Sequence, residues 1–121
     1  MSEELITKND NSDLHILDEL VQRAVIDSAA TGDIVVVAAV AGKRIRVVAV
    51  EFIASGVVST KWTSAAAGTT ISGVQSNVDG SGQQLGLNPI GWFETVAGDA
   101  LVLNKTAAIQ TGGSLLYTLE D

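Results

Sequence analysis

The chain has 121 residues, no cysteine, one histidine and a formal net charge of −7. The absence of cysteine excludes disulfide scaffolds, thiolate zinc sites and cysteine nucleophiles, and one histidine cannot supply the three or four ligands of an imidazole or thiolate metal site. Because an acidic chain without a basic cluster binds phosphate backbones poorly, nucleic acid is not an expected partner. The length of the chain predicts one domain.

Residues 1–20 form an acidic stretch that holds six aspartates and glutamates against a single lysine. This composition predicts an N-terminal arm, flexible or docked on a neighbouring copy, in front of a domain at residues 21–121. The only histidine, His15, falls in the arm, so a Ser-His-Asp relay would lack an ordered base. A catalytic triad is therefore not expected.

Three apolar residues of the arm, Leu14, Ile16 and Leu17, allow two interpretations. The segment is either a solvated tether with a short helix at 13–21, or a contact with another copy of the chain. The chain starts without the basic and apolar regions of a secretory signal. The longest apolar run, 34–41, has eight residues, and a spanning helix needs about 20, so no membrane contact is expected.

The domain is organised around residues 32–54, where two runs rich in β-branched residues flank a break at Gly42. This pattern predicts a β-hairpin whose turn uses the positive φ that glycine allows. The strand at 33–39 is apolar on both faces, which is typical of a strand packed on both sides or placed at a subunit contact.

The rest of the domain reads as short strands separated by turn residues. The segments predicted as strands are 21–28, 57–63, 69–74, 84–87, 100–105 and 114–120, with a further short strand after Pro89. In 57–63, Val58, Thr60 and Trp62 alternate with polar residues and should face the core, whereas 75–83 reads as a long polar connection. The spacing predicts an all-β fold, an antiparallel β-sandwich or small barrel of about eight strands.

Few residues offer catalytic or ligand-binding chemistry. A glycosidase would need paired carboxylates from among Glu51, Glu94 and Asp99, but none stands beside an aromatic platform for a sugar. The segment 79–82 lacks the spaced acids of a calcium loop and reads as a turn. We therefore expect that the protein is not an enzyme and binds no cofactor or metal. A small hydrolase remains an alternative, and it requires two of the carboxylates to share a cleft.

The tryptophans, Trp62 and Trp92, could stack on a carbohydrate if they are exposed, although tryptophan on a strand is more often part of the core. The pair Trp92 and Phe93 lies close to the only proline, which suggests a packed corner or a subunit contact. With 46% hydrophobic residues in so small a domain, some apolar surface should exceed what one core covers. Self-association is expected, with Leu14, Ile16, Leu17, Trp92 and Phe93 as candidate contacts.

Four segments carry a resemblance to a known family. They are Gly32-Asp33 followed by Val-Val-Ala-Ala-Val-Ala-Gly-Lys-Arg-Ile-Arg-Val at 36–47, Asn-Pro-Ile-Gly-Trp-Phe-Glu-Thr at 88–95, Ala-Gly-Asp-Ala-Leu at 97–101, and Gly-Gly-Ser-Leu-Leu-Tyr at 112–117. In combination they resemble the small β-sandwich decoration, or cement, proteins of tailed-bacteriophage heads.

The resemblance covers residues 21–121 and implies a jelly-roll-like sandwich without catalysis or cofactor. It implies a homotrimer that is made in the host cytoplasm and binds the outside of the phage capsid, where it stabilises the lattice of the major capsid protein. Similar domains occur on phage fibres and tails, so a fibre, tail or receptor-binding (carbohydrate-binding) module is the alternative.

Overall fold

The computed structural model describes residues 21–121, which contain ten β-strands and no helix. The strands are β1 (Gln22–Ser28), β2 (Gly32–Val37), β3 (Arg44–Ala54), β4 (Val58–Ser64), β5 (Thr69–Thr70), β6 (Gln75–Asn77), β7 (Gly82–Leu85), β8 (Phe93–Glu94), β9 (Leu101–Lys105) and β10 (Thr111–Glu120). Several are short: β5 and β8 have two residues each.

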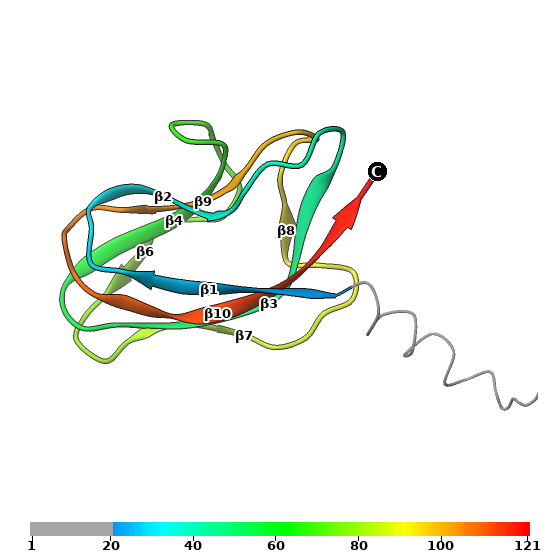
Figure 1. The fold of residues 1–121 in the computed structure, drawn as a ribbon. Coiled ribbons are helices and arrows are strands. Elements are labelled where there is room, and N and C mark those ends of the chain that lie inside the picture. Colours follow the sequence, from blue (N-terminus) through cyan, green and yellow to red (C-terminus); the bar gives the residue numbers. More distant parts are fainter. Residues whose placement is uncertain (1–20) are drawn as a thin grey trace, which may run out of the picture.

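The strands form two antiparallel sheets that pack face to face (Figure 1). Sheet A has the order β1-β10-β3-β7, with β8 also paired to β3, and sheet B has the order β2-β9-β4-β5, with β6 also paired to β4. The first two strands therefore pair with the last two, in opposite sheets, which is the connectivity of a jelly roll. The predicted all-β sandwich is confirmed, with about ten strands where the sequence predicted about eight.

The hairpin predicted at 32–54 is wrong. Its two strands are β2 and β3, which belong to different sheets: β2 pairs with β9, and β3 pairs with β10. A strand with apolar residues at alternate positions can line the inner face of either sheet, and residues 38–43 are long enough to cross between sheets about 10 Å apart. The turn itself is as predicted, because Gly42 has a φ of 74° and the amide of Lys43 donates to the carbonyl of Val40.

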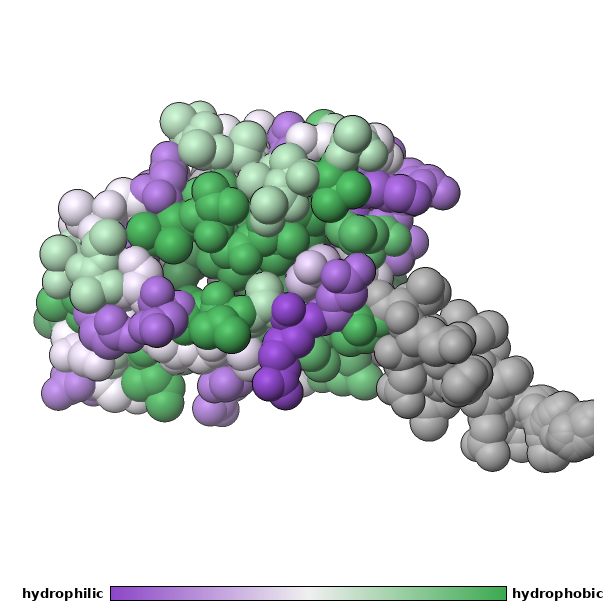
Figure 2. Space-filling model, in the orientation of Figure 1, coloured by the Kyte–Doolittle hydropathy of each residue, from purple (hydrophilic) through white to green (hydrophobic). Residues whose placement is uncertain are grey.

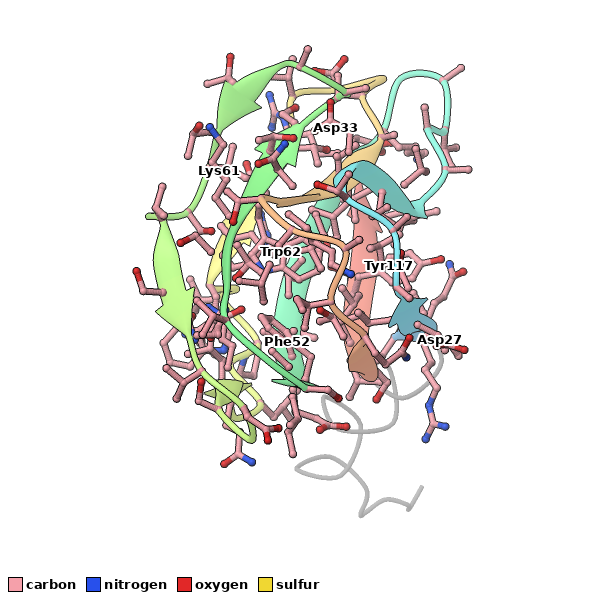
Figure 3. All side chains as sticks on the ribbon, turned by 90° about the vertical axis from the view of Figure 1, so that its left-hand side faces the viewer. Asp27, Asp33, Phe52, Lys61, Trp62 and Tyr117 are labelled. Carbon is pink, nitrogen blue, oxygen red and sulfur yellow. The ribbon has the colours of Figure 1, made fainter. Side chains whose placement is uncertain are left out.

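The core lies between the sheets and is built from alternate residues of the longest strands. Its fully buried members include Ile45, Val47 and Phe52 from sheet A, which face Trp62, Leu101 and Leu103 from sheet B. Figure 3 shows Phe52 and Trp62 between the sheets, with Lys61 pointing away from them. The predicted inward face of β4 is confirmed, since Val58, Thr60 and Trp62 are all buried. Burial of each large apolar side chain contributes about 1.5–3 kcal/mol.

The segment 75–83 is not the long connection that its polarity suggested. It contains β6 and the first residues of β7. Asn77 points inward and is buried, and its Nδ2 donates to the carbonyl of Val58 and to Oγ1 of Thr60, at 3.1 and 3.2 Å. A polar residue can line the core when its hydrogen bonds are made there, and such a strand has no apolar alternation to reveal it.

Two glycines let neighbouring strands approach β3 closely. Gly113 on β10 lies opposite Phe52, and Gly82 on β7 lies opposite Ile53. A Cβ on Gly82 would be 1.7 Å from the carbonyl oxygen of Phe52, and one on Gly113 would be 2.0 Å from that of Glu51. The central strand of sheet A is therefore held between two positions that accept no side chain.

Candidate interaction surface

The loop between β7 and β8, residues 86–92, carries large apolar side chains into solvent. Ile90 is 83% exposed and Trp92 is 44% exposed, and Leu87 is also exposed. We call these three residues the apolar loop cluster. Scattered exposed apolar residues are normal, but three within six residues of one loop form a candidate contact surface.

Backbone hydrogen bonds fix both ends of this loop to β3. The amide of Asn88 donates to the carbonyl of Val48 at 2.7 Å, and the amide of Trp92 donates to that of Val47 at 2.8 Å. Within the loop, the amide of Ile90 donates to Oδ1 of Asn88, which forms an Asx turn around Pro89. The loop is therefore clamped at both ends to a central strand of the sandwich.

Side chains under the loop hold it further. Nε1 of Trp92 donates to the carbonyl of Gly86 at 2.8 Å, which orients the indole. Gly91 has a φ of 98°, and a Cβ there would lie 2.5 Å from Cγ of Arg46. The guanidinium of Arg46 is in turn 3.1 Å from Oε1 of Glu94. Position 91 therefore requires glycine, both because its φ is positive and because Arg46 occupies the space that a Cβ would need.

The structure separates the two aromatic residues that the sequence offered as contacts. Trp92 lies at the surface, whereas Phe93 is half-buried and packs against the core, with its ring centroid 5.9 Å from that of Trp62. The other candidate contacts, Leu14, Ile16 and Leu17, lie outside the described residues. Sequence reasoning missed Leu87 and Ile90, although their position beside the Asn88-Pro89 turn was a signal for an exposed loop.

Of the two candidate sugar platforms, only Trp92 is accessible. Trp62 is 1% exposed, and its Nε1 donates to Oε1 of Gln83 on the opposite sheet. It therefore belongs to the core, the ordinary role of a tryptophan on an alternating strand. The segment 79–82 contains a turn and the start of β7, and the amide of Ser81 closes the turn by donating to the carbonyl of Val78.

The three candidate carboxylates each have different neighbours. Glu51 lines a shallow groove of about 550 Å³ on the outer face of sheet A, Glu94 pairs with Arg46, and Oδ2 of Asp99 accepts a hydrogen bond from Oγ of Ser64 at 2.8 Å. Within residues 21–121, no three histidine, cysteine, aspartate or glutamate side chains gather as a metal site would require. Glu94 thus forms a salt bridge, Asp99 accepts a hydrogen bond, and Glu51 lines a groove.

No known protein family, curated protein or solved structure matches this chain. Nor does the described part of the chain contain a helix with the length and hydrophobicity that crossing a membrane requires.

Lys105 is a charged residue whose side chain the fold buries. Lys105 on β9 is 1% exposed, and its Nζ donates to the carbonyls of Ser28 and Ile109, at 2.5 and 2.7 Å. Burial lowers the pKa of Lys105 because the charged form loses hydration. The ammonium ties the β1–β2 turn to the β9–β10 connection, a structural role that the sequence did not reveal.

Proposed function

We propose that this protein is a virion structural protein, a head decoration protein of a tailed bacteriophage that binds the capsid exterior as a trimer. In this role it stabilises the lattice of the major capsid protein. Two things support the proposal: the segments that resemble phage cement proteins, and a jelly-roll sandwich that presents the exposed apolar loop cluster. The second is the single observation that carries it.

The geometry of the loop suits a binding role. Because the backbone at Asn88 and Trp92 is already bonded to β3, the loop has little conformational freedom to lose when it contacts a partner. Burial of exposed apolar side chains such as Ile90 then contributes directly to binding. A trimer would present three copies of the loop, and simultaneous engagement raises the apparent affinity without new contacts.

The test combines a mass measurement with a binding assay. We expect the purified protein to be a trimer by native mass spectrometry and to cosediment with expanded capsid shells of its phage that lack the decoration protein. Ile90→Asp should abolish either the trimer or the binding to shells, and which one is lost identifies what the loop contacts. Val74→Asp is the matched control, because Val74 is also exposed but lies next to β6, on sheet B.

A monomer that does not bind shells would contradict the proposal. So would a trimer whose binding to shells is the same for Ile90→Asp as for the parent protein.

A carbohydrate-binding module of a phage fibre or tail is the second candidate, and the accessible indole of Trp92 is the observation that favours it. A sugar stacked on this ring would shift its fluorescence, whereas the buried Trp62 would not respond. Titration with a series of glycans should shift the tryptophan fluorescence, and Trp92→Phe should remove this shift. The absence of any glycan-dependent shift would exclude this candidate.

A further inference from the structure

The sandwich has one side where its apolar interior is incompletely covered. Strand β1 pairs only with β10, and β2 pairs only with β9, among the described residues, so each is the edge of its sheet. Between these edges lie half-buried apolar side chains that we call the β1–β2 seam: Ala24, Ile34, Val36, Tyr117 and Leu119. Figure 2 shows a hollowed hydrophobic surface on this side, between the two strands.

The edges of the seam also offer backbone groups. An edge strand presents free N–H and C=O groups along one side, and it accepts an extended segment as an additional strand. The β2 edge holds four consecutive apolar residues, 34–37, without a proline or lysine to protect it. The seam therefore favours an extended partner with apolar side chains.

Residues 13–20 of the same chain have the composition that this partner needs. The segment Asp-Leu-His-Ile-Leu-Asp-Glu-Leu carries Leu14, Ile16, Leu17 and Leu20. Eight extended residues span about 26 Å, which exceeds the roughly 23 Å of a seven-residue strand such as β1. The segment is long enough to cover the seam along the whole of β1.

The charges agree with this assignment. Arg44 at the start of β3 is exposed and forms no ion pair with another described residue, whereas Arg46 pairs with Glu94 and Arg23 lines the groove on the outer face of sheet A. Arg44 lies towards the end of the sandwich where β1 begins, since it is opposite Glu120, and Gln22 is opposite Tyr117 on the same strand β10. Either end of the segment, Asp13 at one and Asp18 with Glu19 at the other, would bring the opposite charge to this end.

The direction of β1 indicates whether the segment that covers the seam comes from the same chain or from a second copy. Its first residue, Gln22, lies at the end of the seam, so the chain before it could enter its own seam only by reversing within residues 19–22. The sequence Glu-Leu-Val-Gln contains none of the glycine, proline, asparagine, aspartate or serine residues that favour tight turns. We propose that residues 13–20 of one copy bind the β1–β2 seam of a second copy.

This inference rests on the homo-oligomer of the proposed function but not on the capsid. The natural absence of cysteine allows a direct test with single-cysteine variants of the full chain. Ile16→Cys and Val36→Cys chains are coexpressed and treated with a short bismaleimide. We expect covalent two-chain species that contain one chain of each variant, identified by mass, because only these require the arm of one copy to reach the seam of another.

Three comparisons make the result decisive. Coexpression of Ile16→Cys with Val74→Cys, on the side of sheet B away from β2, should give no species that joins the two variants. Ala24→Cys should replace Val36→Cys as acceptor if the latter variant unfolds. A chain that carries both Ile16→Cys and Val36→Cys and forms only intrachain links would overturn the proposal, as would the absence of any link or equal linking to Val74→Cys. Linking without binding to shells would sustain this inference and refute the capsid role; a trimer that binds shells without linking would do the reverse.

Discussion

Trp62 and Phe93 lie with their ring centroids 5.9 Å apart, and they come from opposite sheets of the sandwich. The indole Nε1 of Trp62 also reaches sheet A, where it donates to Oε1 of Gln83 at 3.0 Å. A single side chain of β4 therefore contacts β7 and β8 across the core. The first prediction concerns this connection between the layers.

We expect Trp62→Phe to lower the free energy of unfolding by about 1–3 kcal/mol, because it removes buried volume and leaves Gln83 without its donor. Urea denaturation followed by circular dichroism measures the change. Trp92→Phe is the matched control: its ring is partly in solvent, and we expect a loss below about 1 kcal/mol. Equal losses for the two variants would contradict the assignment of Trp62 to the core.

The close approach of strands to β3 gives a second prediction. Gly82→Ala and Gly113→Ala would each place a Cβ within 2.0 Å of a backbone oxygen, so the sheet must shift to accept it. We expect each substitution to cost more than about 3 kcal/mol or to prevent folding, well above the roughly 1 kcal/mol of an average mutation. Gly73→Ala, whose Cβ meets nothing within 4 Å, should leave the melting temperature nearly unchanged.

The loop after β4 gives a third prediction, with the opposite sign. Ala65 and Ala67 have φ values of 71° and 54°, a region that costs a non-glycine residue about 1–2 kcal/mol. Ala67→Gly keeps the amide that donates to Oδ2 of Asp33, and we expect it to stabilise the protein by about 0.5–1 kcal/mol. Ala66→Gly, at an exposed neighbouring position with ordinary φ, should destabilise it by a similar amount. A thermal melt of both variants checks the contrast.

The buried ammonium of Lys105 gives a fourth prediction. Lys105→Met removes the donor to the carbonyls of Ser28 and Ile109, and we expect a loss of about 1–3 kcal/mol in unfolding free energy. Lys61→Met, on the outer face of β4, should change stability by less than about 0.5 kcal/mol. Comparable effects of the two substitutions would show that Lys105 does not join the two connections.

The same residue sets a direction for the dependence on pH. Burial lowers the pKa of Lys105 below its ordinary value of 10.5, so between the two values the unfolded chain binds a proton that the folded chain lacks. The part of the stability that is linked to this titration is therefore fully present above about pH 10.5 and is lost as the pH falls through the folded pKa, in addition to what the hydrogen bonds of Lys105 contribute. Urea titrations at several alkaline pH values give the free energy of unfolding as a function of pH. This free energy should rise more steeply with pH for the parent protein than for Lys105→Met.

How much of this fold was predictable depends on what each residue pattern encodes. Alternation encodes which side chains of a strand face inward, and it correctly placed Val58, Thr60 and Trp62 in the core. It does not encode which sheet a strand joins, so β2 and β3 were wrongly paired. The strand around Asn77 was missed because hydrogen bonds, rather than apolar side chains, satisfy its inward position.

The candidate surface was predictable only in part. The sequence singled out Trp92 and Phe93 together, but a one-residue step along a strand turns a side chain to the opposite face, and only Trp92 remained accessible. The burial of Lys105 depends on carbonyls from residues 28 and 109, which are far apart in the chain. No local pattern reveals such a contact before the fold is known.

The position of β10 between β1 and β3 has a consequence for how the protein is made. During synthesis, β1 leaves the ribosome before the other described strands, but its only neighbour among them is the tenth, Thr111–Glu120. Sheet A therefore cannot be completed until β10 has emerged, and β1 stays unpaired until then. The domain can fold only after β10 has been made, so a chain stalled before β10 is a natural substrate for chaperones and proteases.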